Sequence, residues 1–135
     1  MRVLMVDDDD LVRTVAADTL EGAGFEVIEA ATAEEALDRC GERTADVLFT
    51  DIMLSGSLDG WDIAEQCREA DPDLPVIYTT RYSLRKQRPV RGSRLLQKPY
   101  AGSDLVRIID DMMGRVKRPA FESSPRLKAA GGVLR

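Results

Sequence analysis

Five short apolar runs, spread over residues 2–97, constrain the fold of this chain more than any other feature. The runs occupy residues 2–6, 25–28, 46–50, 76–79 and 94–97. Apolar runs of this length, bounded by polar residues, are typical of buried strands in a parallel sheet. Helix-like segments separate most of them, so strand and helix alternate along the chain. This alternation predicts a doubly wound α/β sheet.

The segments between the runs carry helix signals. Helices are expected at about residues 10–20, 33–40 and 61–69, and from about Ser103 onward, because apolar residues recur there at helical spacing. Asp9 or Asp10 can cap the first helix, since a side-chain oxygen at that place accepts a backbone N–H. Thr32 and Glu35 have the form of a capping box for the second helix.

Residues 81–93 differ from the other connections. Pro89 and Gly92 interrupt this stretch, so we expect one or two irregular turns there. The predicted fold is therefore a flavodoxin-like, five-stranded parallel sheet of order 2-1-3-4-5, with helices on both faces and an irregular fourth helix. Residues 1–116 are expected to form this one domain, and residues 117–135 a flexible basic C-terminal tail.

Polar side chains follow four of the five predicted strands. Asp7 and Asp8 follow the first strand, Asp51 the third, Thr80 the fourth and Lys98 the fifth. In open α/β sheets, ligands bind beyond the carboxyl ends of the strands. The order 2-1-3-4-5 places strands 1 and 3 at the point where the winding reverses. We therefore expect three carboxylates, a hydroxyl and an ammonium to meet at one edge of the sheet.

That set of groups suits a divalent metal ion and a phosphoryl group. Mg²⁺ prefers carboxylate, water and phosphate oxygens, which Asp8 and Asp51 can supply with help from Asp7. An Asp carboxylate such as Asp51 can attack a phosphoryl group and form an acyl phosphate. Lys98 would offset charge on the phosphoryl oxygens, and the Thr80 hydroxyl would bond one of them after it arrives.

Composition excludes several other chemistries. The 135 residues contain no histidine, so an imidazole base, a Ser-His nucleophile and a histidine phosphate carrier are all absent. No apolar stretch approaches the roughly 20 residues that cross a bilayer, and the first run turns acidic too early for a signal peptide. A cytoplasmic protein is expected. Cys40 and Cys67 are then expected to be buried thiols, because a disulfide is disfavoured in a reducing compartment.

Charge is distributed unevenly along the chain. Residues 1–73 hold 20 acidic and 5 basic side chains, whereas residues 74–135 hold 4 acidic and 14 basic ones. No acidic residue lies between Leu74 and Ser103. The basic segment at residues 81–94 would suit an acidic partner or a contact between two copies of the chain. A solvated, Arg-rich loop explains it equally well.

Together, these residues resemble the receiver domain of two-component response regulators. The matching segments are VLMVDDDDLVR, DVLFTDIMLSGSLDGWDIA, LPVIYTTRYS and LLQKPYAGSDLVRII, which extend from about Arg2 to Met113. Each motif alone is weak, but their order and spacing are specific. The resemblance implies a phosphorylation-dependent signalling switch of a phosphorelay. It implies no enzyme beyond self-phosphorylation from donors and self-dephosphorylation.

The resemblance also implies a role for each site residue. Asp51 would accept a phosphoryl group from a histidine kinase or a histidine phosphotransfer protein. Asp7, Asp8, Asp51 and the Met53 backbone carbonyl would hold Mg²⁺ or Mn²⁺. Thr80 and Lys98 would contact the phosphoryl oxygens. The bond between Lys98 and Pro99 would be cis, which is reasonable at a tight turn.

The chain departs from the family pattern in three places. Leu95 and Leu96 stand where an aromatic switch residue is usual, so Tyr82 and Tyr100 are secondary switch candidates. Arg81 stands where a small residue usually follows the threonine, and it would restrict access to the phosphoryl group or contact it. The segment for the fourth helix is short, basic and broken by proline, so output by another surface or by loop ordering is expected.

Several alternatives remain open. A stand-alone receiver is expected, with no DNA-binding domain, no membrane contact, an unidentified downstream target, and a homodimer through residues 81–94 and the last helix as an option. The chain could instead be a receiver cut from a hybrid histidine kinase, or a degenerate receiver that acts as a phosphorylation-independent interaction module. A haloacid-dehalogenase-type phosphatase would need an acidic pair after Lys98, and only Asp110 and Asp111 in the last helix are available. A nucleic-acid binder is disfavoured by the net charge of −5.

Overall fold

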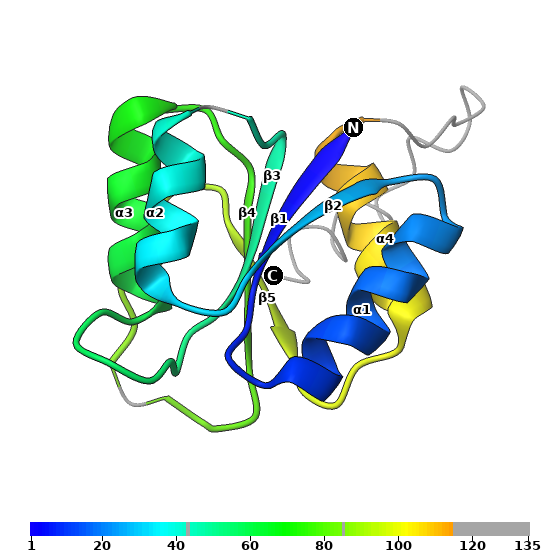
Figure 1. Ribbon diagram of the computed structural model, residues 1–135, viewed down its shortest axis with the longest axis horizontal. Coiled ribbons are helices and arrows are strands. Elements are labelled where there is room, and N and C mark those ends of the chain that lie inside the picture. The colour runs from blue at the N-terminus through cyan, green and yellow to red at the C-terminus, as the bar shows by residue number, and fades with distance from the viewer. Residues whose placement is uncertain (43, 85, 115–135) are drawn as a thin grey trace, which may run out of the picture.

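The computed structural model describes residues 1–42, 44–84 and 86–114 (Figure 1). Its strands are β1 (Arg2–Val6), β2 (Glu26–Ala30), β3 (Val47–Asp51), β4 (Val76–Thr80) and β5 (Arg94–Gln97). Its helices are α1 (Asp10–Gly22), α2 (Ala33–Gly41), α3 (Gly60–Ala70) and α4 (Gly102–Met112). All five predicted strands and all four predicted regular helices are present.

The strands form one parallel sheet in the order β2-β1-β3-β4-β5, as predicted. The chain begins inside the sheet at β1, moves outward to the edge strand β2, and then crosses back to the central strand β3. The winding therefore reverses between β1 and β3. Val6 lies opposite Thr50 in the register of these two strands, so their carboxyl ends finish side by side. Such a point is where doubly wound sheets form a ligand crevice.

Helices cover both faces of the sheet (Figure 1), with α2 and α3 on one face and α1 and α4 on the other. Strand β1 contributes side chains to the cores on both faces of the sheet. Val3 and Met5 pack in the core beneath α1 and α4, whereas Leu4 and Val6 pack in the core beneath α2 and α3. All four side chains are almost fully buried. A central parallel strand is covered on both sides, so its sequence is apolar without alternation.

Side chains cap three of the four described helices, two of them at predicted positions. Asp9, the first of the two candidates, accepts backbone N–H groups from the first turn of α1. The Thr32 hydroxyl accepts the backbone N–H of Glu35 at the start of α2, at 3.1 Å. Asp59 and Asp62 form a reciprocal capping box at the start of α3, which the sequence analysis did not predict. These caps satisfy N–H groups that have no partner inside the helix.

The connection between β4 and β5 contains bends and turns but no helix in its described residues, in line with the irregular segment expected there. Polar contacts attach it to α3 and to the side chain of Tyr78 in β4. The guanidinium of Arg88 lies 2.8 Å from a carboxylate oxygen of Asp62 and 2.9 Å from one of Glu65. The backbone N–H of Val90 donates to the Tyr78 hydroxyl at 3.0 Å. These contacts fix the position of the connection, a role that the packing of a helix would otherwise fill.

The prediction that Cys40 and Cys67 are free thiols is wrong, because the two residues form a disulfide. Cys40 lies in α2 and Cys67 in α3, and their Cα atoms are 5.3 Å apart. The two helices pack side by side on one face of the sheet, and both cysteines face the buried core. Their separation of 27 residues along the chain gives no sign of this contact.

Helix α4 follows its predicted apolar spacing, with Leu105 and Ile109 fully buried against α1 and the sheet. The last predicted apolar position, Val116, and the tail at residues 117–135 lie outside the described residues. None of the described helices combines the length and the apolar character that a membrane span needs.

Candidate functional site

The carboxyl ends of four strands bring Asp7, Asp51, Thr80 and Lys98 together. Asp7 follows β1, Asp51 and Thr80 end β3 and β4, and Lys98 follows β5. The ammonium of Lys98 lies 2.9 Å from Asp7 Oδ2 and 3.0 Å from Asp51 Oδ2. All three charged side chains are at most 10% exposed. Residues far apart in the sequence thus form one buried charged centre, as the strand order predicts.

Burial and charge oppose one another at this centre. Burial raises the pKa of Asp51, and its hydrogen bond with Lys98 offsets only part of that effect. Burial also disfavours the charged form of Lys98, but its bonds with Asp7 and Asp51 outweigh this and raise the pKa of the amine. Lys98 is therefore held as a cation, and Asp51 gains from any further positive charge that comes near it.

Asp7, Asp8 and Asp51 each offer a carboxylate oxygen, and these oxygens lie within 4.8 Å of one another. Asp7 is oriented from both sides, because its Oδ1 accepts the backbone N–H of Asp9 while its Oδ2 binds Lys98. The cluster holds three carboxylates and Lys98 bonds two of them, so the cluster carries excess negative charge. Hard oxygen donors in this number suit Mg²⁺ or Mn²⁺.

Ser55 holds the outermost carboxylate of this cluster. The backbone N–H and the hydroxyl of Ser55 donate to Asp8 Oδ2, at 2.8 and 2.7 Å. The hydroxyl hydrogen bond is the main reason that the pKa of Asp8 is lowered. Ser55 lies in the loop between β3 and α3, and the sequence analysis did not single it out. No sequence motif marks it, because its partner is 47 residues away.

Thr80 and Lys98 are also joined through the backbone. The Lys98 N–H donates to the Thr80 carbonyl at 2.8 Å, which continues the pairing of β4 with β5. The Thr80 hydroxyl accepts the N–H of Tyr82 at 3.1 Å, an arrangement that leaves its hydrogen able to be donated. The bond between Lys98 and Pro99 is cis, the isomer that the family resemblance implies.

The loop after β3 passes close to Asp51. The backbone N–H of Met53 donates to Asp51 Oδ1 at 3.3 Å, and Met53 is among the residues that line the acidic pocket. Gly60 begins α3 directly against this strand end. A Cβ atom at Gly60 would lie 2.8 Å from the Ile52 Cα and would also meet the Asp51 carbonyl oxygen. No motif in the sequence singles out Gly60, whereas the structure requires glycine there.

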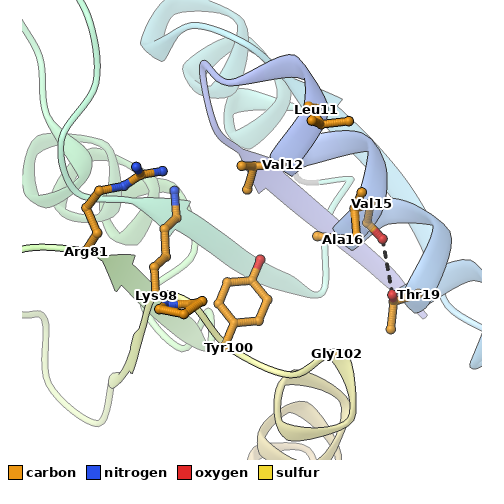
Figure 2. Close-up of a pocket in the computed structure, with 10 residues that line it drawn as sticks. Leu11, Val12, Val15, Ala16, Thr19, Arg81, Lys98, Tyr100 and Gly102 are labelled. Atoms are coloured by element: carbon orange, nitrogen blue, oxygen red, sulfur yellow. Dashed lines mark hydrogen bonds between the residues drawn. The ribbon is translucent and has the colours of Figure 1, made fainter.

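Two hollows open beside the charged centre. The acidic pocket, of about 270 Å³, is lined by Asp7, Asp8, Asp9, Asp51, Met53, Arg81, Tyr82 and Lys98. The α1 groove, of about 650 Å³, lies mainly along the apolar side chains of α1, with Tyr100 on its opposite wall (Figure 2). Arg81 and Lys98 line both hollows and therefore stand at the boundary between them.

The tyrosines differ in their surroundings. Tyr100 packs edge to face against Phe49, with ring centroids 5.7 Å apart. Burial, together with the nearby charges of Asp7 and Asp51, raises the pKa of Tyr100 to about 12. Tyr82 is more than half exposed at the acidic pocket. Of the two leucines that replace the usual aromatic residue, Leu96 packs against the core beneath α1 and α4.

Comparisons with known proteins agree with this geometry. The family model for the response regulator receiver domain matches residues 3–110. The chain is 31% identical over 116 residues to the response regulator receiver protein CpdR of Brucella abortus (strain 2308), covering 83% of this chain and 96% of that protein. It spans about half the length of some other curated relatives that it matches.

Solved structures show the same likeness. The receiver domain of the hybrid histidine kinase CckA superposes with a TM-score of 0.74 and 33% identity, over 84% of this chain and 99% of that one. A response regulator receiver protein from Sinorhizobium medicae WSM419 superposes with a TM-score of 0.80 and 26% identity, over 84% of this chain and 94% of that one. By sequence motif, strand order and family match, the chain belongs to the response regulator receiver domain family.

Proposed function

We propose that this receiver domain is a phosphorylation-dependent switch in which Asp51 accepts the phosphoryl group. The observation that carries the proposal is the buried bridge from Lys98 to both Asp7 and Asp51. Burial raises the pKa of Asp51, and one cation contacts it beside two further carboxylates. Additional positive charge near Asp51 would therefore stabilise its ionised form. Asp51 is also the one carboxylate of the cluster that ends a central strand.

The reaction follows from the position of Asp51. A carboxylate oxygen of Asp51 attacks the phosphorus of a phosphohistidine, and the phosphorus–nitrogen bond breaks. The electron pair leaves with the imidazole, which then takes up a proton. The chain has no histidine of its own, so the phosphoryl group comes from another molecule. We infer that this donor is a histidine kinase or a histidine phosphotransfer protein.

Asp7, Asp8, Asp51 and the Met53 carbonyl would hold Mg²⁺ or Mn²⁺, as the donor set suits such ions. When bound, the ion neutralises charge on the phosphoryl oxygens during transfer. Asp7 and Asp8 are already oriented by hydrogen bonds from the backbone of Asp9 and from Ser55. This order reduces the reorganisation that metal binding requires.

Thr80 and Lys98 then change their contacts in response to the new charge. Phosphorylation adds an anionic group at Asp51, and Lys98 must redistribute its contacts between Asp7 and the phosphoryl oxygens. The Thr80 hydroxyl turns toward the same group, which strains or breaks its bond from the Tyr82 N–H. The side chain of Tyr82 is exposed, whereas that of Tyr100 is packed against Phe49, so we favour Tyr82 as the residue that changes position.

We also propose that a second copy of the chain docks through residues 81–94 and α4. Leu95 is 45% exposed on β5, which is an edge strand of the sheet. The connection that precedes β5 contains no helix in its described residues. Exposed edge strands readily pair with other chains. Sedimentation of the phosphorylated and unphosphorylated protein tests this. A monomer in both forms, at concentrations up to the millimolar range, would contradict it.

Intact mass after incubation with a small-molecule phosphodonor tests the central proposal. The wild type is expected to gain one phosphoryl group in the presence of Mg²⁺, and Asp51→Asn none. Both proteins should show a cooperative thermal transition, because the substitution keeps the side-chain volume. No adduct on a folded wild type that binds Mg²⁺ would instead support a phosphorylation-independent interaction module.

A further inference from the structure

Arg81 is an exposed basic side chain that lines the acidic pocket. It directly follows Thr80 at the end of β4, and its side chain is exposed. Within residues 1–42, 44–84 and 86–114 its guanidinium makes no ion pair and no hydrogen bond. Arg13, Arg88 and Arg94, in contrast, are each paired with a carboxylate. Arg81 is therefore available to an anion that enters the pocket.

Arg81 and Lys98 share the same pocket walls. Both line the acidic pocket together with Asp7 and Asp51, and both line the α1 groove. Figure 2 shows the guanidinium of Arg81 directed toward the ammonium of Lys98. Among the described residues, Asp7 and Asp51 form ion pairs with Lys98, and no carboxylate of the pocket forms one with Arg81. An anion placed between the two cations would gain two charge-assisted contacts.

A charge count favours a phosphoryl group as that anion. A phosphorylated Asp51 carries a charge of about −2. Together with Asp7 and Asp8, it is balanced by one divalent ion, Lys98 and one further cation. Among the described residues that line the acidic pocket, Arg81 is the remaining basic side chain. Without Arg81, the phosphorylated centre would keep one uncompensated negative charge next to a buried sheet edge.

We propose that Arg81 binds the phosphoryl group on Asp51 and lengthens the lifetime of the phosphorylated state. The inference rests on the proposed function of Asp51. A guanidinium binds two phosphoryl oxygens at once, in a fixed fork that a lysine cannot reproduce. Arg81 is thus a specificity-determining residue that acts on the phosphoryl group itself, beside the contacts made by Thr80 and Lys98.

The position of Arg81 also decides the direction of its effect on hydrolysis. Loss of the phosphoryl group requires a water oxygen to attack phosphorus while the bond to the Asp51 oxygen breaks. The electron pair returns to the Asp51 carboxylate, and the proton of the water passes to phosphate or solvent. Asp51 is buried and Arg81 is exposed on the wall of the same pocket, so water from solvent approaches the phosphoryl group from the side on which Arg81 lies, the mouth of the pocket. A guanidinium bound across the phosphoryl oxygens at the mouth obstructs that approach.

The test compares the lifetime of the adduct in four proteins. Wild type, Arg81→Ala, Arg81→Lys and Arg91→Ala are phosphorylated with a small-molecule donor, freed of donor by rapid desalting, and followed by intact mass. Arg91 is the matched control, because it is an exposed arginine of the same connection that does not line the acidic pocket. Arg81→Ala is expected to lose the adduct about tenfold faster than wild type, as for the loss of one charge-assisted contact. The adduct on Arg81→Lys should have a lifetime between those of wild type and Arg81→Ala. The lifetime on Arg91→Ala should match that of wild type.

Binding of beryllium fluoride with Mg²⁺ provides a second readout that does not depend on phosphoryl transfer. This anion complex mimics the phosphoryl group, and its binding can be followed by the shift in thermal transition. Arg81→Ala should bind it about tenfold more weakly than wild type and Arg91→Ala. A thermal transition at the wild-type temperature in the absence of ligand would show that the fold is intact.

The outcomes separate this inference from the proposed function. If the wild type is phosphorylated at Asp51 and Arg81→Ala keeps both the lifetime and the beryllium fluoride affinity, the role of Arg81 is refuted and the switch stands. A longer lifetime in Arg81→Ala would likewise overturn the shielding argument. If the wild type takes neither a phosphoryl group nor beryllium fluoride, the proposed function fails and the inference fails with it.

Discussion

Asp51 occupies a position in which its own charge is disfavoured. It ends a strand that is buried on both faces, and Lys98 is the cation that contacts its carboxylate. Asp7 adds a second negative charge beside the same ammonium. Such a centre lowers the stability of the fold, and the same charges prepare it to bind a metal ion and a phosphoryl group. Strain of this kind is common at functional sites.

Stability should therefore depend on pH through Asp51. Its pKa in the folded protein is raised above the ordinary value of about 3.9. The folded state then binds the proton more tightly than the unfolded state, so Asp51 lowers stability as pH rises from about 4 through its folded pKa. Without divalent ions, Asp51→Asn should melt at nearly the wild-type temperature at pH 4 and a few degrees higher at pH 7. Thermal transitions of both proteins across this range provide the measurement, and parallel curves would contradict it.

Ser55 is expected to position Asp8 for metal binding. Ser55→Ala removes the hydroxyl hydrogen bond to Asp8 Oδ2 but keeps the one from the backbone. The affinity for Mg²⁺ should fall by about tenfold, the low end for groups that orient a ligand. Calorimetric titration with Mg²⁺ measures this, with Ser57→Ala as the control because Ser57 is exposed in the same loop. Equal affinities in the two variants would show that Ser55 does not act on Asp8.

At the scale of elements, α3 must approach the end of β3 very closely. Gly60 is the residue at this contact, and its backbone N–H donates to the Ile52 carbonyl at 2.8 Å. A side chain at Gly60 would push α3 away from the loop that carries Met53 and Ser55. The packing of one helix against one strand end thus controls the shape of the acidic pocket.

Gly60→Ala should destabilise the fold by about 1–3 kcal/mol, because the added Cβ meets backbone atoms that cannot move aside freely. Phosphorylation at Asp51 should also slow. Gly22→Ala is the matched control, since a Cβ there has no heavy atom within 4 Å and should stabilise α1 by up to about 1 kcal/mol. Urea unfolding of both variants makes the comparison. Equal stability of the two would mean that α3 shifts without cost.

At the scale of the whole molecule, the disulfide links two helices of one layer. Cys40 in α2 and Cys67 in α3 close a loop with a sequence separation of 27 residues. Both helices lie on the face of the sheet opposite α1 and α4 (Figure 1). The bond is remote from the acidic pocket, so it acts on the stability of the domain and leaves the arrangement of Asp7, Asp51 and Lys98 to the sheet.

Reduction of this disulfide should lower the free energy of unfolding by about 3–4 kcal/mol, the loop-closure value for a loop of this length. Urea unfolding with and without dithiothreitol measures the change. The double variant Cys40→Ser with Cys67→Ser should unfold at the same urea concentration with and without the reductant. An equal response of wild type and double variant to reductant would contradict a bonded pair.

The elements and the site differ in how far the sequence predicts them. The strands were predictable because a parallel strand covered on both faces needs an uninterrupted apolar run, as residues 3–6 show. The meeting of Asp7, Asp51 and Lys98 was predictable because parallel strands end at one edge. Ser55 and Gly60 were not, because their roles depend on how closely one loop and one helix approach a strand end.

The sequence by itself determined the alternation of strands and helices, the strand order and the residue types at the strand ends, since each depends on local periodicity and on the handedness of strand connections. Only the tertiary structure decided that Cys40 meets Cys67, that Ser55 holds Asp8, and that Arg81 lines the same pocket as Lys98. These contacts depend on distances of a few ångström between segments far apart in the chain. Such distances are set by the packing of the whole domain, which no local pattern encodes.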